Sequence, residues 1–189
     1  MLILKDLISH GRVRACYYHP KDSRLCVKVA LKPKHKKLLQ KEINNDARFR
    51  RTIGKYVPRY YKIVSTNKGP GLLTDLIYDD DNRLSPRLAD WVCAGKPITK
   101  DMVDQFDDFF TRLLKYKLWF YDFNDENFLI RTSKGKPCLY FVDTKSLNRH
   151  NSWSTLKLEY IVPALARRRM LRRIQRFYHM FLHKSFRHQ

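Results

Sequence analysis

The segment Tyr121–Ile130 holds the side chains with the clearest chemical potential in this sequence. Asp122 precedes Asn127 by a spacer of four residues, and the apolar run Phe128–Ile130 follows at once. A carboxylate can orient a hydroxyl group and accept its proton, while an amide oxygen and a second carboxylate can hold Mg²⁺ against phosphates. These are the groups that transfer of a phosphoryl group to a hydroxyl needs.

The same chemistry needs a second carboxylate and a cation, and their order along the chain is what makes the pattern persuasive. Asp143 follows an apolar strand after the turn-forming residues 132–137. Lys28 lies far upstream in an apolar strand, where a lysine is rarely buried without a partner. Glu42, the only acidic residue between Lys28 and Asp46, lies in the helical stretch that follows and is expected to hold Lys28.

This order resembles that of the protein kinases. The Asp122–Asn127 spacing is similar to the catalytic loop H-R-D-x-x-x-x-N, Lys28 to the lysine of V-A-I-K, and Asp143 to the aspartate of D-F-G. The resemblance implies that ATP and Mg²⁺ are the cofactors. It makes Asp122 the catalytic base and Asn127 and Asp143 the metal ligands, with Lys28 gripping the α and β phosphates.

The sequence also departs from that pattern. Gly11 is the single glycine where kinases carry G-x-G-x-x-G, so Arg12 or Arg14 is expected to help bind phosphate there. Asp143 is followed by Thr144-Lys145 rather than Phe-Gly, and no A-P-E element follows. We therefore expect a kinase of small molecules or sugars with a reduced C-terminal lobe. The altered motifs keep open the alternative of a pseudokinase, which binds nucleotide without turnover.

Four groups of residues are similar to the YrbL family, named for the PhoP regulatory network: Gly11-Arg12 with Cys16–Pro20, Cys26–Val29, Thr66–Leu72 and Tyr121–Asn124. This resemblance covers most of residues 8–150 and implies a bacterial protein with a kinase-like fold. More distantly the pattern is similar to the lipopolysaccharide core kinases. Those enzymes imply a sugar or anionic glycolipid as the acceptor, at the cytoplasmic face of the membrane.

The elements that must position these residues give an α+β fold of the protein-kinase-like type. Residues 24–31 alternate, with Lys28 on one face and Val27 and Val29 on the other, as in a half-buried strand. Further strands are expected at 12–18, 60–65, 71–77, 128–131 and 138–142, with a helix from Pro33 to about Ile53. A second helix is expected from the N-cap Thr99 to near Tyr116.

We expect three parts: a nucleotide lobe with an antiparallel sheet at 1–78, a mainly helical lobe at 79–162, and a basic amphipathic helix at 163–189. In the last part Met170, Ile174, Phe177 and Phe181 share one helical face. The remaining faces carry a run of arginines expected to contact an anionic substrate or membrane surface. These are Arg167, Arg168, Arg169, Arg172, Arg173 and Arg176.

Three simpler interpretations stay open at this point. Asp122 could only cap a turn, Lys28 could extend to solvent from an edge strand, and the arginines could form a merely solvated helix face. The composition adds a further alternative: 39 Lys and Arg against 18 Asp and Glu give a net charge of +21, which also suits a nucleic-acid binder.

The composition also indicates whether the chain can form a core and in which cellular compartment it is expected. With 43% hydrophobic residues the chain can form a packed core. Its four cysteines lack C-x-x-C spacing, which argues against a zinc site and fits a reducing compartment. No signal peptide or long apolar segment is evident. A cytoplasmic location is therefore expected, peripheral to the inner membrane if the basic helix binds it.

Overall fold

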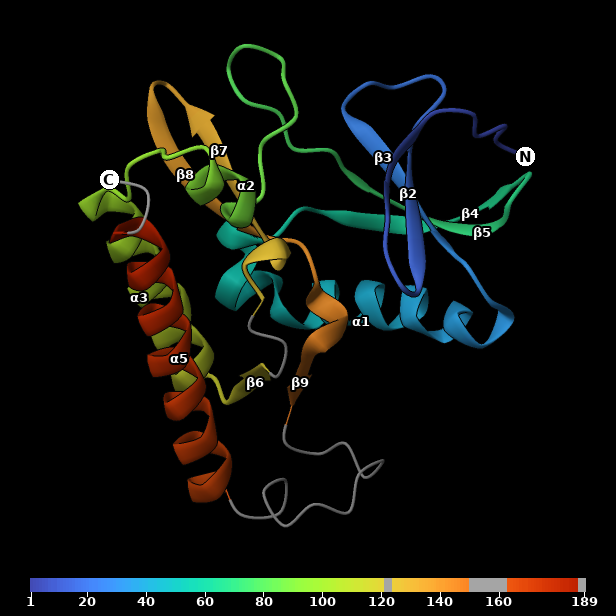
Figure 1. The fold of residues 1–189 in the computed structure, drawn as a ribbon. Helices are drawn as coiled ribbons and strands as arrows, with labels where there is room; N and C mark the ends of the chain where they lie inside the picture. Colours follow the sequence, from blue (N-terminus) through green and yellow to red (C-terminus); the bar gives the residue numbers. More distant parts are fainter. Residues whose placement is uncertain (121–123, 150–162, 187–189) are drawn as a thin grey trace. The chain divides into compact units, whose positions relative to one another are not determined.

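A computed structural model describes residues 1–120, 124–149 and 163–186. The chain divides into two compact units, Met1–Ile77 and Tyr78–Gln189 (Figure 1). Each unit is described by itself.

The first unit is built on one antiparallel sheet of five strands in the order β1-β2-β3-β5-β4. The strands are β1 (Leu7–His10), β2 (Arg14–Tyr18), β3 (Leu25–Ala30), β4 (Tyr60–Thr66) and β5 (Gly69–Asp75). Lys28 therefore lies in the middle strand, and the edge-strand interpretation is wrong. Strand β1 was not predicted, because its residues Leu-Ile-Ser-His show no alternation of apolar and polar types.

The alternation predicted for residues 24–31 is confirmed, and it gives the sheet two different faces. On one face Val27, Val29 and Leu73 pack with Leu4 of the N-terminal segment. That segment is fastened by the Leu4 amide, which donates to the Asn67 side chain at 2.9 Å. The opposite face carries Lys28.

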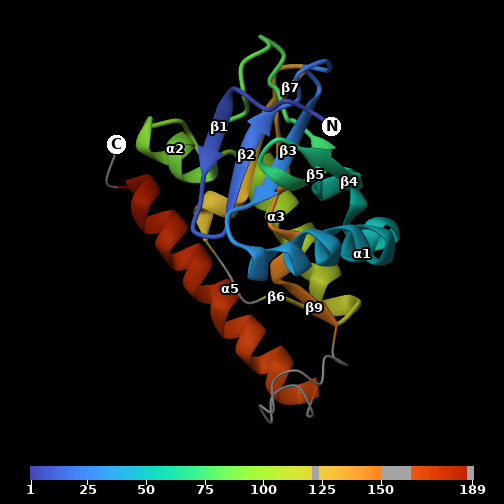
Figure 2. The same ribbon diagram turned by 90° about the vertical axis from the view of Figure 1, so that its right-hand side faces the viewer.

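Helix α1 (Lys36–Ile53) lies along the Lys28 face (Figure 2). A short 3-10 turn, η1 (Pro33–His35), precedes it, so the predicted start at Pro33 is confirmed. Leu39 of α1 forms a buried cluster with Tyr60 and Leu72 of the sheet. Another 3-10 turn, η2 (Gly54–Tyr56), leads from the helix towards β4. This packing brings the inner face of α1 against the polar side of β3.

The described residues of the second unit form three helices and two small sheets. The helices are α2 (Leu88–Cys93), α3 (Lys100–Lys115) and α5 (Pro163–Phe186), and the short 3-10 turns are η3 (Asp125–Asn127) and η4 (Thr144–Ser146). The strands are β6 (Leu118–Phe120) paired with β9 (Leu147–Arg149), and β7 (Phe128–Ser133) paired with β8 (Lys136–Phe141). Helix α2 and the β6–β9 pair were not predicted.

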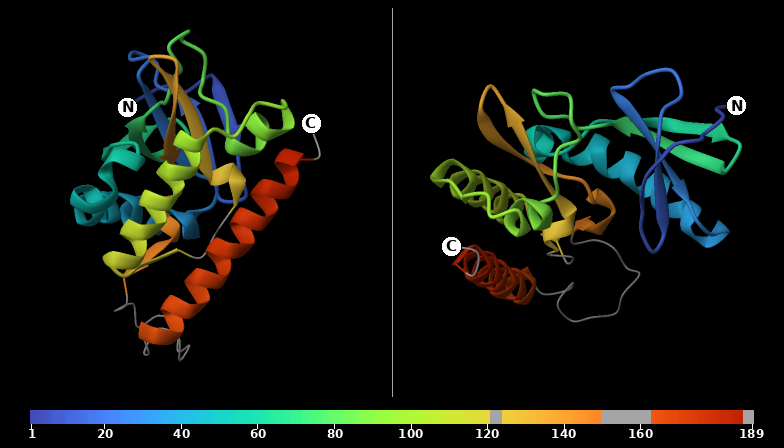
Figure 3. Two further views of the ribbon diagram at one scale, coloured as in Figure 1. Left: turned by 90° about the vertical axis from the view of Figure 1, so that its left-hand side faces the viewer. Right: turned by 45° about the horizontal axis from the view of Figure 1, so that its top comes forward.

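Helix α3 begins where its sequence predicts. The Thr99 side chain accepts a hydrogen bond from the Met102 amide at 3.3 Å, and Tyr116 caps the other end. Gln105 joins the helix to β8, since its side chain accepts from the Leu139 amide at 2.8 Å and donates to the Pro137 carbonyl at 2.7 Å. The β7–β8 hairpin thus lies beside α3 (Figure 3).

The buried face of α3 meets the apolar face of α5, and the two helices run side by side (Figures 1 and 3). Phe177 of α5 lies 5.3 Å from Phe106, 5.6 Å from Phe110 and 5.5 Å from Phe128, measured between ring centroids. Met170 and Ile174 are also buried. The predicted amphipathic pattern is therefore core packing at these positions; the side chain of Phe181 lies outside the described residues.

Within the part of the chain that the structure describes, no helix is long and apolar enough to cross a bilayer. The exposed arginines of α5 are Arg167, Arg168, Arg172 and Arg176, while Arg169 and Arg173 are partly covered. Among the described side chains of α5, this basic side is exposed, whereas Met170, Ile174 and Phe177 on the apolar side are buried.

Replacing Phe177 by alanine should lower the free energy of unfolding of the second unit by about 3–5 kcal/mol, because it removes an aromatic ring from a packed core. All three tryptophans, Trp91, Trp119 and Trp153, belong to this unit, so urea unfolding followed by tryptophan fluorescence isolates it. Met180→Ala is the control, since that side chain is 51% exposed. Equal losses in both variants would show that α5 is not part of the core.

Candidate functional site

Lys28 and Glu42 form the pair that the sequence predicts. The ammonium nitrogen of Lys28 lies 3.9 Å from Oε1 of Glu42. The Glu42 side chain, on the buried face of α1, is 0% exposed, and that of Lys28 is only 12% exposed. Because an ionised group is costly to bury without a counter-charge, this pairing explains why both residues are tolerated at that depth.

A second cation shares the same carboxylate. Arg14, at the start of β2, forms an ion pair with Oε2 of Glu42, and its side chain is 15% exposed. The strand register places Cys16 opposite Lys28 and Arg14 opposite Ala30, so Arg14 and Lys28 are diagonal neighbours on the face that α1 covers. The alternation of side chains along each strand could have been used to predict which face Arg14 and Lys28 occupy. The register between the two strands, which makes the two residues neighbours, cannot be predicted from the sequence.

Tyr60 completes the surroundings of Lys28. Its hydroxyl lies 3.4 Å from the Lys28 nitrogen, which sits 4.8 Å from the ring centroid. Burial disfavours the charged form of Lys28, but the Glu42 carboxylate and Tyr60 outweigh it and raise the pKa of the lysine above its usual value. Lys28 is therefore a cation at neutral pH, as a phosphate-binding lysine must be.

Two cysteines line this face of the sheet. Cys26 is buried, as expected for a cysteine that packs as a small apolar residue. A hydrogen bond from Cys26 lowers the pKa of Cys16 against the effect of burial, and the charges of Lys28 and Arg14 act in the same direction. The Cys16 thiol is therefore close enough to Lys28 and Arg14 for their positive charges to act on it.

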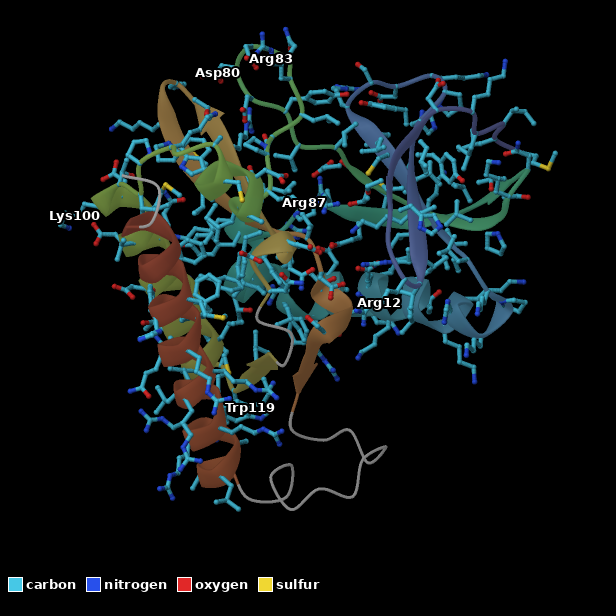
Figure 4. All side chains as sticks on the ribbon, in the orientation of Figure 1. Arg12, Asp80, Arg83, Arg87, Lys100 and Trp119 are labelled. Atoms are coloured by element: carbon cyan, nitrogen blue, oxygen red, sulfur yellow. The ribbon has the colours of Figure 1, made fainter. Side chains whose placement is uncertain are left out.

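Gly11 and Arg12 lie in the turn that joins β1 to β2. The Gly11 amide donates to the Arg14 carbonyl at 2.8 Å and so closes the turn. Arg12, labelled in Figure 4, is exposed on the same turn. The phosphate-binding roles expected for these two residues remain predictions.

Asn127 and Asp143 lie at the open end of the β7–β8 hairpin. The terminal pair of the ladder joins Phe128 to Phe141, and the Val142 amide donates to the Asn127 carbonyl at 2.9 Å. Asn127 is the last residue of η3, and the Asn124 side chain caps that turn by accepting from the Glu126 amide at 3.0 Å. The hairpin therefore brings together the two residues expected to bind metal.

Asp143 is 2% exposed, and its carboxylate pairs with Lys145. The Ser146 hydroxyl donates to the Asp143 carbonyl at 2.7 Å and fixes the turn η4 that follows. Carboxylate and amide oxygens are the donors that Mg²⁺ prefers, so Asn127 and Asp143 fit that ion by type. Lys145, which was not predicted, holds part of the carboxylate in this structure.

The loop 79–83 is fastened to the hairpin at its far end. Asp79 accepts from the Ser85 hydroxyl at 2.7 Å and from the Thr132 amide at 2.8 Å. The labelled side chains of Asp80 and Arg83 mark this loop in Figure 4. These contacts stiffen the hairpin that carries Asn127 and Asp143.

Asp122, the predicted catalytic base, lies outside the described residues, as do Tyr121 and Phe123. Its role remains a prediction from the sequence. Lys28 and Glu42 belong to the first unit, whereas Asn127 and Asp143 belong to the second. Each pair is thus assembled within its own unit.

Residues 1–182 match the family model described as "PhoP regulatory network protein YrbL". The chain belongs to this family. The YrbL protein of Escherichia coli K12 is 32% identical over 88 residues, which cover 43% of this chain and 40% of that relative. The YrbL protein of Shigella flexneri gives the same values.

Solved structures of a kinase domain and of WbdD share the fold. The kinase domain of PF14_0431 superposes with a TM-score of 0.59 at 12% identity, over 80% of this chain and 52% of that one. WbdD superposes with a TM-score of 0.54 at 11% identity, over 97% and 50% of the two chains. WbdD has also been crystallised with a kinase inhibitor, and that structure gives a TM-score of 0.51 at 15% identity over 84% and 35%. The α+β, kinase-like fold predicted from the sequence is confirmed.

Proposed function

We propose that the protein is an ATP- and Mg²⁺-dependent phosphotransferase whose acceptor is a hydroxyl of a sugar or anionic glycolipid of the lipopolysaccharide type. The observation that carries the proposal is the buried ion pair between Lys28, in the middle strand of a kinase-like sheet, and Glu42 of α1. Burying a charged lysine is energetically unfavourable, and a role in binding nucleotide phosphates would account for its presence here.

In this proposal each residue has one task. Lys28, positioned by Glu42, binds the α and β phosphates. Asn127 and Asp143 would hold Mg²⁺, which neutralises charge on the phosphates when bound. Asp122 orients the acceptor hydroxyl and accepts its proton. Lys145 must release part of the Asp143 carboxylate for the metal to bind.

The basic side of α5 supports an anionic acceptor. Arg167, Arg168, Arg172 and Arg176 are exposed, and near an anionic leaflet each basic residue contributes about 1 kcal/mol of binding free energy. We propose that this surface holds the protein at the cytoplasmic face of the inner membrane. A nucleic-acid partner would use the same charge, but the kinase-like fold gives no independent reason to expect one.

The test is a transfer assay with γ-phosphate-labelled ATP and Mg²⁺. The acceptors are lipopolysaccharide, a neutral glycolipid and a free sugar. We expect label on lipopolysaccharide, at a rate that falls when Arg168, Arg172 and Arg176 are replaced by glutamine.

The alternative is a regulatory nucleotide-binding module, which the Lys145–Asp143 pair favours. Nucleotide binding without transfer to any acceptor would establish that alternative.

A further inference from the structure

We infer that the exposed side of helix α1 binds the phosphate backbone of a nucleic acid, without reading its base sequence. The inference does not depend on the proposed nucleotide site. It starts from the residues that α1 and the preceding turn η1 leave exposed, because every charged residue among them is basic. These residues are Lys34, Lys36, Lys37, Arg48 and Arg51.

The four exposed cations of α1 form a stripe along one side of the helix. At 100° per residue, Lys36, Lys37, Arg48 and Arg51 fall within about 120° of one another around the axis. At a rise of 1.5 Å per residue they extend over about 22 Å, which is roughly the length of six phosphates of one nucleic-acid strand. We call these four residues the α1 stripe.

Both acidic residues of α1 lie away from the α1 stripe. Glu42 is fully buried and forms ion pairs with Lys28 and Arg14 of the sheet. Asp46 is partly buried and forms an ion pair with Arg50. A solvated helix face commonly carries both signs of charge, whereas the exposed side of this fully described helix carries one.

The lysines at the start of α1 do not serve the stability of the helix. Its first turn contains no acidic residue, and Lys36 and Lys37 lie where the positive end of the helix dipole disfavours cations. Helix α3 shows the favourable arrangement, with Asp101 in its first turn. An anionic partner therefore explains the two lysines better than helix stability does.

The uncharged residues of the same side favour a nucleic acid over an anionic bilayer. No large apolar side chain of α1 is exposed in this fully described helix, whereas a helix that lies in a membrane interface inserts apolar side chains. The basic helix α5 differs, because Leu165 and Met180 are 38% and 51% exposed. Gln40 and Asn44, exposed between the cations of the α1 stripe, carry amide groups of the kind that contact phosphate and sugar oxygens.

The experiment measures binding of the full chain to labelled duplex DNA of about 20 base pairs and to single-stranded RNA of about 20 nucleotides. Fluorescence anisotropy is followed between about 50 and 200 mM salt. Replacing all four residues of the α1 stripe by glutamine should weaken binding at least about tenfold. It should also lower the slope of log K against log salt by about 3–4 for DNA or about 2–3 for RNA, since each phosphate contact contributes about 0.9 or 0.7.

The matched control removes the same number of charges from the net charge of +21, at exposed lysines outside α1. It should lower the slope by less than about 1. Its substitutions are Lys5→Gln, Lys21→Gln, Lys134→Gln and Lys136→Gln. Glutamine is a good helix former, so α1 should stay folded, and the double variant Lys37→Gln with Arg51→Gln should give about half the change in slope.

Vesicles of phosphatidylglycerol and phosphatidylcholine test the membrane alternative. The variant of the α1 stripe should bind them as the unmodified protein does. Loss of vesicle binding without loss of nucleic-acid binding would assign the α1 stripe to a membrane and overturn the inference. Equal weakening of nucleic-acid binding by the stripe and control variants would also overturn it, because net charge alone would then explain the binding. So would the absence of nucleic-acid binding by the unmodified protein.

Discussion

Glu42→Gln is expected to lower the free energy of unfolding of the first unit by about 3–5 kcal/mol. The substitution keeps the shape of the side chain but leaves two largely buried cations, Arg14 and Lys28, without their carboxylate. Removing one partner of a buried ion pair costs that much because the remaining charge is still desolvated. The effect on nucleotide affinity follows from the same change, since Lys28 loses the group that positions it.

Cys26 provides the measurement, since it is buried in β3 and becomes reactive only when that strand opens. Alkylation of Cys26 across a urea titration therefore reports unfolding of the first unit alone. Arg24→Gln, also in the first unit, is the control, because Arg24 is 86% exposed in its ion pair with Asp22 and should contribute less than about 1 kcal/mol. A loss for Glu42→Gln no larger than for Arg24→Gln would mean that the cluster is hydrated and not a buried site.

Asp122→Asn should lower the turnover number about 10²–10⁴-fold without weakening Mg-ATP binding. The amide can still accept a hydrogen bond from the acceptor hydroxyl, but it cannot take up the proton, and a general base contributes an effect of that size. Glu126→Gln, which removes an exposed carboxylate four residues further along the chain, is the control for a nonspecific loss of negative charge. Both variants are compared in the labelled transfer assay. Turnover by Asp122→Asn at the rate of the unmodified protein would remove Asp122 from the mechanism.

Alternation and capping residues made most of the framework readable from the sequence. Patterns that depend on a few neighbouring residues predicted three features: which residues of β3 share a face, the N-cap Thr99, and the hairpin before Asp143. The expectation that Glu42 holds Lys28 succeeded because a lysine inside a sheet needs a carboxylate, and only one lay within reach.

The remaining features depend on contacts that sequence patterns do not encode. Strands β6 and β9 have three residues each, too few to show a period. The apolar face of α5 has the same spacing whether it meets a membrane or a core, and only its contacts with Phe106 and Phe110 decide between them. Lys145 pairs with Asp143 across a turn whose geometry the sequence does not specify.

The most direct test of the account is the calorimetric titration of the protein with Mg-ATP, alongside Lys28→Met and Asp143→Asn. We predict saturable binding that requires Mg²⁺ and that each variant weakens at least about tenfold, since each removes one charged contact with the phosphates or the metal. At 100 times the dissociation constant, the ligand should also stabilise the native protein by about 2.7 kcal/mol. Absence of binding by the unmodified protein, or binding that neither variant weakens, would contradict the central claim that this kinase-like chain binds Mg-ATP and that Lys28 and Asp143 each contribute to that binding.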